Sequence, residues 1–110
     1  MEKAEFIWHS GKFVPWDEAQ VHVLSHGLHY GTGVFEGIRA YSTSRGPAIF
    51  RLKEHTDRLF NSAKVYEIAI PFTRKQIADA CLETLGASGL PSAYLRPVAF
   101  WGYGRFGLHA

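Results

Sequence analysis

Residues 26–39, HGLHYGTGVFEGIR, constrain the fold of this chain more than any other segment. Four glycines lie among aromatic and ionisable side chains, so the backbone can adopt positive φ angles and other groups can approach it closely. Two interpretations stay open on these residues alone. The segment is either a glycine-kinked strand and turn in a small domain, or the wall of a pocket around a flat ligand.

The chain has 110 residues, the size of one domain, and its 46% hydrophobic residues can form a modest core. A net charge of +2 and scattered basic residues argue against nucleic-acid binding. Residues 1–5 lack the apolar core of a signal peptide, and no stretch is long enough to span a bilayer. The single Cys81 excludes an internal disulfide. We therefore expect a soluble, cytoplasmic protein with no nucleic-acid or membrane partner.

The first half of the chain is predicted to be mainly strand. Apolar runs flank Gly11 as in a β-hairpin, and residues 20–24 alternate as a half-buried strand does. Residues 34–41 are predicted to form a further strand, followed by a turn over residues 42–47 and a return strand over residues 48–50.

The second half is predicted to contain two helices and a last strand. Apolar residues recur at helical spacing over residues 52–67. Thr73 and Gln76 form a capping-box pattern for a helix that should stop near Gly86, and residues 93–101 should be a strand. This order predicts an α+β fold, with a mainly antiparallel sheet and two helices packed on one face.

Three charged or aromatic residues stand out, although their types alone leave the function open. Arg58 lies in the first predicted helix, where it is either an exposed surface arginine or a phosphate ligand. Tyr94 and Arg96 are two apart, so a strand would place them on one face, as a surface pair or as a carboxylate site. Pro97 removes a ladder hydrogen bond and predicts either a sheet edge or a strand end there.

Histidines and the cysteine are interpreted as structural. His22, His26 and His29 lack the further ligands that a zinc site needs, so we expect no metal. Cys81 falls on the apolar stripe of the second helix and is expected to be a packed small hydrophobe.

Residues 29–39, HYGTGVFEGIR, resemble the signature of branched-chain amino acid aminotransferases, which are class IV, D-amino-acid-aminotransferase-like enzymes that use pyridoxal phosphate. Further motifs follow in family order: FIW at residues 6–8, FRLKEH at 50–55, SAK at 62–64 and AYLRP at 93–97. The resemblance covers essentially the whole chain, but only the smaller amino-terminal domain of such an enzyme. It implies a small domain over residues 1–101, the start of an interdomain loop over 102–110, and a larger domain that this chain lacks.

The resemblance also implies roles for individual residues. Arg58 would contact the phosphate of pyridoxal phosphate, and Phe35 would form an apolar wall for a branched side chain. Tyr94 and Arg96 would accommodate the side-chain carboxylate of glutamate. The implied substrate-binding positions are Tyr30, Phe35, Gly37, Tyr94, Arg96 and Leu108. Because Tyr30 and the loop position of Leu108 reach the neighbouring subunit in this family, a homodimer or higher homo-oligomer is implied.

A transaminase needs a lysine that forms a Schiff base with its cofactor. None of the five lysines here resembles that lysine in context, and the family carries it in the second domain. We expect the whole enzyme to transfer amino groups between leucine, isoleucine or valine and 2-oxoglutarate. The 110-residue chain, with no catalytic residue of its own, should be inactive alone and should not retain pyridoxal phosphate.

Other functions stay open at this point. Another class IV enzyme, such as a D-amino-acid aminotransferase or aminodeoxychorismate lyase, would use the same scaffold. A non-catalytic assembly domain would also explain the 15% aromatic residues. A generic ligand-binding module has no motif of its own in this sequence.

Overall fold

A β-hairpin opens the chain, as predicted. In this computed structural model, which describes residues 4–102, β1 (Phe6–His9) pairs antiparallel with β2 (Lys12–Pro15). Ser10 and Gly11 form the turn with φ angles of 51° and 98°. A single 3-10 turn, Trp16–Glu18, follows the hairpin.

The strand predicted over residues 20–24 is wrong. This segment is an irregular loop in which the Leu24 amide donates to His22 Nδ1 at 3.0 Å. Val23 and Leu24 are 71% and 57% exposed, so the alternation has no buried face to stabilise a strand. The glycine-rich segment instead begins with a short helix, α1 (His26–Tyr30), which Gly31 ends with a φ of 67°.

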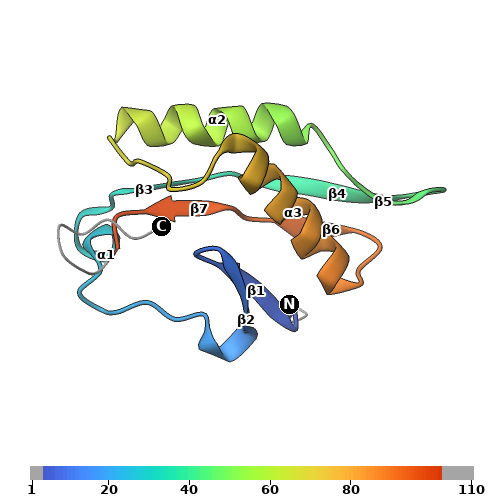
Figure 1. Ribbon diagram of the computed structural model, residues 1–110, viewed down its shortest axis with the longest axis horizontal. Helices are drawn as coiled ribbons and strands as arrows, with labels where there is room; N and C mark the ends of the chain where they lie inside the picture. The colour runs from blue at the N-terminus through green and yellow to red at the C-terminus, as the bar shows by residue number, and fades with distance from the viewer. Residues whose placement is uncertain (1–3, 103–110) are drawn as a thin grey trace.

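Two antiparallel segments of the chain, each made of two short strands, form a long ribbon through the centre of the molecule (Figure 1). One side of the ribbon is β3 (Gly33–Phe35) and β4 (Ile38–Thr43), and the other is β6 (Ala93–Leu95) and β7 (Val98–Phe100). β3 pairs with β7 and β4 pairs with β6 in one continuous register.

Both predicted long strands therefore exist, but each is interrupted in the middle. The Glu36 amide donates to the Pro97 carbonyl at 3.0 Å, whereas Pro97 has no amide hydrogen to return the bond. Of the two alternatives predicted at Pro97, a sheet edge or a strand end, the structure shows a strand end, since β6 stops at Leu95 and β7 starts at Val98. The matching break at Glu36 and Gly37 follows from the same missing donor across the ribbon.

A further strand, β5 (Gly46–Ile49), pairs with the edge of β4 that β6 leaves open, so that β5, β4 and β6 form a three-stranded sheet. The predicted turn over residues 42–47 is too long, because Thr43 already pairs with Gly46. The described residues thus form three small antiparallel sheets rather than the one sheet that we expected.

The first long helix is α2 (Leu52–Val65), close to its predicted range. Thr56, Leu59 and Ala63 are buried, and Leu59 and Ala63 belong to a core cluster with Val34 of β3. The predicted buried stripe ends there, since Tyr66 beyond the helix is 52% exposed.

The second long helix is α3 (Arg74–Ser88), and its capping box is confirmed. The Gln76 amide donates to Thr73 Oγ1 at 3.1 Å, and the Thr73 amide donates to Gln76 Oε1 at 2.8 Å. The predicted stop at Gly86 is wrong. The helix continues until Gly89 takes the left-handed conformation, with a φ of 68°.

The two long helices contact each other, and α2 runs along the ribbon while α3 crosses it (Figure 1). The α+β class is confirmed. Ribbon positions facing the helices are buried, namely Val34, Glu36, Ile38, Ala40, Leu95 and Ala99. On the opposite face of residues 33–40 and 93–100, five positions are exposed, namely Phe35, Arg39, Tyr94, Arg96 and Val98, and three are half-buried, namely Gly33, Gly37 and Phe100. Of the helices in residues 4–102, none is long and apolar enough to cross a membrane.

Candidate functional site

Four of the predicted substrate residues lie together on the exposed face of the ribbon, at its break. Phe35 and Gly37 come from the β3–β4 side, and Tyr94 and Arg96 from the β6–β7 side. Arg96 Nη2 donates to the Tyr94 hydroxyl at 2.8 Å. The Arg96 Cζ atom lies 4.3 Å from the centre of the Phe35 ring, within the range of a cation–π contact. This cluster combines an apolar ring with a solvent-accessible guanidinium.

Gly37 is the fourth member of the cluster, and its role is to leave space. A Cβ atom added at Gly37 would lie 2.9 Å from Cζ of Tyr94 and closer still to the Tyr94 hydroxyl. A side chain at this position would therefore displace the phenol that accepts the Arg96 hydrogen bond.

Glu36 points to the other face of the ribbon, where it meets α2. It is only 4% exposed. Arg58 Nε donates to both Glu36 oxygens, at 3.1 and 2.9 Å, and Arg58 Nη2 donates to Oε1 at 2.8 Å. His55 Nδ1 lies 2.7 Å from the same Oε1 atom.

This network shifts the acid–base equilibria of its members. The Arg58 guanidinium, and to a smaller extent His55, hold the pKa of Glu36 below its ordinary value, although burial opposes them. The Glu36 carboxylate raises the pKa of Arg58 in turn. Glu36 and His55 were not predicted from the sequence. Strand alternation between Phe35 and Gly37 would have placed Glu36 on the helix-facing side, and His55 is one helical turn before Arg58.

Arg58 keeps part of its hydrogen-bonding capacity free. Within residues 4–102 its guanidinium bonds only to Glu36, through Nε and Nη2. The side chain is 67% exposed. A guanidinium has five N–H donors and binds phosphate through two parallel ones. The outer edge formed by Nη1 and Nη2 therefore fits a phosphate group.

The predicted substrate residue Tyr30 is not part of the cluster of Phe35, Gly37, Tyr94 and Arg96. Tyr30 ends α1 and is 72% exposed, with its ring centre 4.5 Å from that of His26. Leu108 lies outside the described residues.

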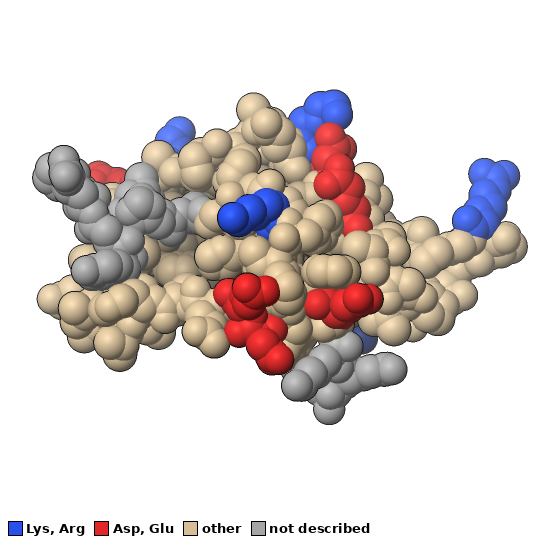
Figure 2. All heavy atoms as spheres, turned by 60° about the horizontal axis from the view of Figure 1, so that its bottom comes forward, with Lys and Arg blue, Asp and Glu red and all other residues tan. Residues whose placement is uncertain are grey.

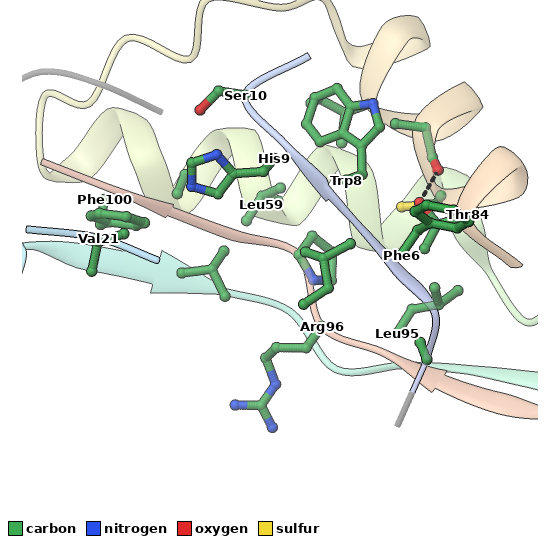
Figure 3. A pocket seen from close by; sticks show the side chains of 18 of the residues that line it. Phe6, Trp8, His9, Ser10, Val21, Leu59, Thr84, Leu95, Arg96 and Phe100 are labelled. Atoms are coloured by element: carbon green, nitrogen blue, oxygen red, sulfur yellow. Dashed lines mark hydrogen bonds between the residues drawn. The ribbon is translucent and has the colours of Figure 1, made fainter. Parts of the chain in front are cut away.

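A hollow with a volume of about 990 Å³ lies between the β1–β2 hairpin, α3 and the β6–β7 side of the ribbon (Figure 3). Tyr94 and Arg96 line it, whereas Phe35, Gly37 and Arg58 do not. Figure 3 shows the Arg96 guanidinium extending away from the helices. The cluster of Phe35, Gly37, Tyr94 and Arg96 therefore belongs only in part to the lining of this hollow.

The model of the amino-transferase class IV family matches residues 33–110. The chain belongs to this family. It is 51% identical over 104 residues to a branched-chain-amino-acid aminotransferase of Pseudomonas aeruginosa, covering 94% of this chain and 34% of that protein. For the Escherichia coli enzyme of the same name, identity is 46% over 101 residues, or 92% of this chain and 33% of that protein. The chain therefore spans about a third of the length of these relatives.

Solved structures of branched-chain amino acid aminotransferases share the fold. The T.th. enzyme, complexed with N-(5'-phosphopyridoxyl)-L-glutamate, superposes with a TM-score of 0.92 at 53% identity, over 98% of this chain and 36% of that one. The same enzyme has also been solved with 4-methylvaleric acid. The Escherichia coli structure gives a TM-score of 0.91 at 45% identity, over 97% of this chain and 35% of that one.

The lysines that the structure describes in this class IV aminotransferase chain lie at its surface. Those within residues 4–102 are all exposed: Lys12, Lys53, Lys64 and Lys75. Lys53 pairs with Asp57, and Asp79 raises the pKa of Lys75, whereas a Schiff-base lysine is activated by a lowered pKa.

His22, His26 and His29 make hydrogen bonds to other residues of the segment 22–32. His26 Nδ1 lies 2.7 Å from Thr32 Oγ1, and His29 Nε2 donates to the Val23 carbonyl at 2.9 Å. His22 accepts from Leu24, as described above. No group of three or more potential metal ligands occurs among the residues that the structure describes.

Proposed function

We propose that this chain is part of a branched-chain amino acid aminotransferase, which exchanges the amino group of leucine, isoleucine or valine with 2-oxoglutarate. The observation that carries the proposal is the contact of Arg96 with the Phe35 ring. One cluster thereby offers an apolar surface and a cation, which suit an aliphatic and an acidic side chain respectively. The names of the relatives and the ligands of the T.th. enzyme structures support it.

In this proposal the substrate side chain binds at the exposed face of the ribbon, and the cofactor phosphate binds on the helix-facing side. Phe35 provides apolar contact for the branched side chain, and burial contributes about 0.8 kcal/mol per methylene group. Arg96, oriented by its bond to the Tyr94 hydroxyl, binds the side-chain carboxylate of an acidic substrate. Gly37 leaves the space that the phenol occupies.

On the helix-facing side, the outer edge of Arg58 would bind the phosphate of pyridoxal 5'-phosphate. That cofactor, when bound, supplies the electron sink for the carbanion formed at the amino acid's α-carbon. The exposed lysines described above support our expectation that the catalytic lysine lies outside this chain. We infer that the 110-residue chain alone neither retains the cofactor nor turns over substrate.

We further propose that the enzyme is a cytoplasmic homodimer. Apolar side chains of the loop and α1 are strongly exposed, with Val23 at 71%, Leu28 at 63% and Tyr30 at 72%. Uncharged residues also cover most of the face in Figure 2, with charges scattered between them. Large exposed apolar areas are typical of surfaces that a partner covers. Tyr30 would reach the neighbouring subunit there, and the family resemblance implies the same role for Leu108, which lies outside the described residues.

A grafted enzyme tests the proposal directly. Residues 1–110 would replace the matching segment of the Pseudomonas aeruginosa relative. In this graft, transamination would be measured with leucine, isoleucine, valine and D-alanine, and cleavage to 4-aminobenzoate and pyruvate would be measured with aminodeoxychorismate. We expect turnover of the three branched-chain substrates with 2-oxoglutarate. Activity with D-alanine or aminodeoxychorismate instead would assign the chain to another branch of class IV. A folded graft with no turnover would support a non-catalytic assembly domain.

A further inference from the structure

Glu36 is a carboxylate in an unusual position, since it is almost fully buried where the ribbon is interrupted. Its exposure is 4%, and buried charges need partners that satisfy them. Those partners are Arg58 and His55, both on α2. The Glu36 amide is also bonded to the Pro97 carbonyl, so its backbone is fixed on the opposite side.

The hydrogen bonds to Glu36 use one edge of the Arg58 guanidinium. Nε and Nη2 bond to the carboxylate, whereas Nη1 bonds to none of residues 4–102. Arginine is long and flexible, and an exposed arginine without such a bond samples many rotamers. The side-on pairing therefore determines which edge of the guanidinium faces solvent.

His55 restricts the carboxylate itself. Its Nδ1 atom lies 2.7 Å from Oε1, the same oxygen that accepts from Arg58 Nη2. His55 is 19% exposed, and its amide donates to the Arg51 carbonyl at the start of α2. Because Oε1 is held by both residues, the carboxylate cannot rotate without losing bonds.

We propose that Glu36, held by His55, is a positioning residue that fixes Arg58 with its outer N–H edge toward a phosphate monoester. This inference rests on the proposed function, which assigns the cofactor phosphate to Arg58. Glu36 contacts neither substrate nor cofactor in this arrangement and acts only through Arg58.

A positioning role for Glu36 predicts a result opposite to that of simple electrostatics. A carboxylate behind the phosphate site repels the anion, so its neutralisation alone would strengthen phosphate binding. If Glu36 positions Arg58, the isosteric Glu36→Gln variant weakens binding, because the amide offers only one oxygen to the guanidinium and its NH₂ group repels the other donor.

Binding of pyridoxal 5'-phosphate to the grafted enzyme tests this prediction. We expect Glu36→Gln to raise the dissociation constant about tenfold or more, as loss of a supporting residue behind a ligand does in metal sites. The dissociation constant of Glu36→Asp should lie between those of the unmodified graft and Glu36→Gln. Glu54→Gln removes a charge from the exposed start of α2 and should leave the dissociation constant unchanged. Unchanged or tighter binding by Glu36→Gln would overturn the inference and leave the proposed function intact. No binding by the unmodified graft would overturn both.

A second measurement covers the case in which Glu36→Gln does not fold. In the 110-residue chain, ¹⁵N nuclear magnetic resonance should detect a slowly exchanging Arg58 Nε–H with hindered guanidinium rotation. His55→Ala should make the exchange of Arg58 Nε–H faster and the rotation of its guanidinium freer, whereas Glu54→Gln should change neither. Fast exchange and free rotation of Arg58 in the unmodified folded chain would contradict the inference without any cofactor.

Discussion

The Tyr94 hydroxyl lies directly against the α-carbon of Gly37, across the interrupted ribbon. A Cβ at Gly37 would approach Tyr94 Cζ to 2.9 Å, closer than packed atoms come. The φ angle of Gly37 is not positive, so the constraint is steric rather than conformational. The absence of a side chain at Gly37 therefore leaves space for the Tyr94 hydroxyl, which accepts the hydrogen bond from Arg96.

Gly37→Ala should move Tyr94 and break its bond to Arg96, while the fold survives. A phenol tip can swing aside, so we expect a loss of unfolding free energy of about 1 kcal/mol. Gly86→Ala is the matched control, because a Cβ there meets nothing within 4 Å and should stabilise α3 by roughly 0.5–1 kcal/mol. Urea denaturation of both variants measures the difference. A Gly37→Ala chain as stable as Gly86→Ala would contradict the close contact.

Alternation along the ribbon predicts opposite results on its two faces. Ile38 is 1% exposed and faces the helices, so Ile38→Ala should cost about 2–5 kcal/mol of unfolding free energy. Val98 is 53% exposed on the other face, and Val98→Ala should change stability by about 0.5 kcal/mol or less. Denaturant midpoints report both values, and similar losses for the two variants would show that the faces are assigned wrongly.

A fall in pH should lower the free energy of unfolding, because it protonates Glu36. Its pKa is lowered in the folded state, so the unfolded chain takes up the proton first as the pH falls. The stabilising contribution is complete above the ordinary value of 4.5 and is lost as the pH drops through the lower folded value. The unfolding free energy measured from pH 3 to 7 should therefore vary less in Glu36→Gln. Asp57 also has a lowered pKa, because of Lys53 and Arg74, so Asp57→Asn should remove a separate part of the dependence.

Cys81 should react slowly with thiol reagents in the folded chain. It is 8% exposed, and burial raises the pKa of its thiol to about 11, so little thiolate forms at pH 8. It is the single cysteine, and labelling with an aromatic disulfide therefore reports on this site alone. Denaturant should accelerate the reaction strongly. Equal rates with and without denaturant would mean that α3 does not bury the thiol.

Local signals in the sequence identified most elements of this fold. The hairpin at Gly11, the capping box of Thr73 and the range of α2 follow from spacing and turn chemistry, which act within a few residues. The errors occurred where distant residues decide. Residues 20–24 alternate between polar and apolar as a strand does, but no sheet lies beside them. The strand predicted over residues 34–41 is interrupted because Pro97 lies opposite Glu36.

The candidate site was predictable to a similar extent. The spacing of Tyr94 and Arg96 predicted that they lie on one face of a strand. The family resemblance added Phe35 and Gly37 as candidate substrate-binding residues. The partners of Arg58 were missed, because Glu36 is 22 residues away in sequence and only the packing of α2 on the ribbon brings it close.

If one cluster serves two kinds of substrate through different residues, removing one of those residues must separate the two substrates. In the grafted enzyme, Arg96→Met should lower kcat/KM for glutamate about thirtyfold, the equivalent of a charge-assisted hydrogen bond of about 2 kcal/mol. The value for leucine should change little, since Phe35 supplies that contact. Arg45→Met, at the distant and exposed turn between β4 and β5, should affect neither. An equal loss for leucine and glutamate in Arg96→Met would contradict this division of roles.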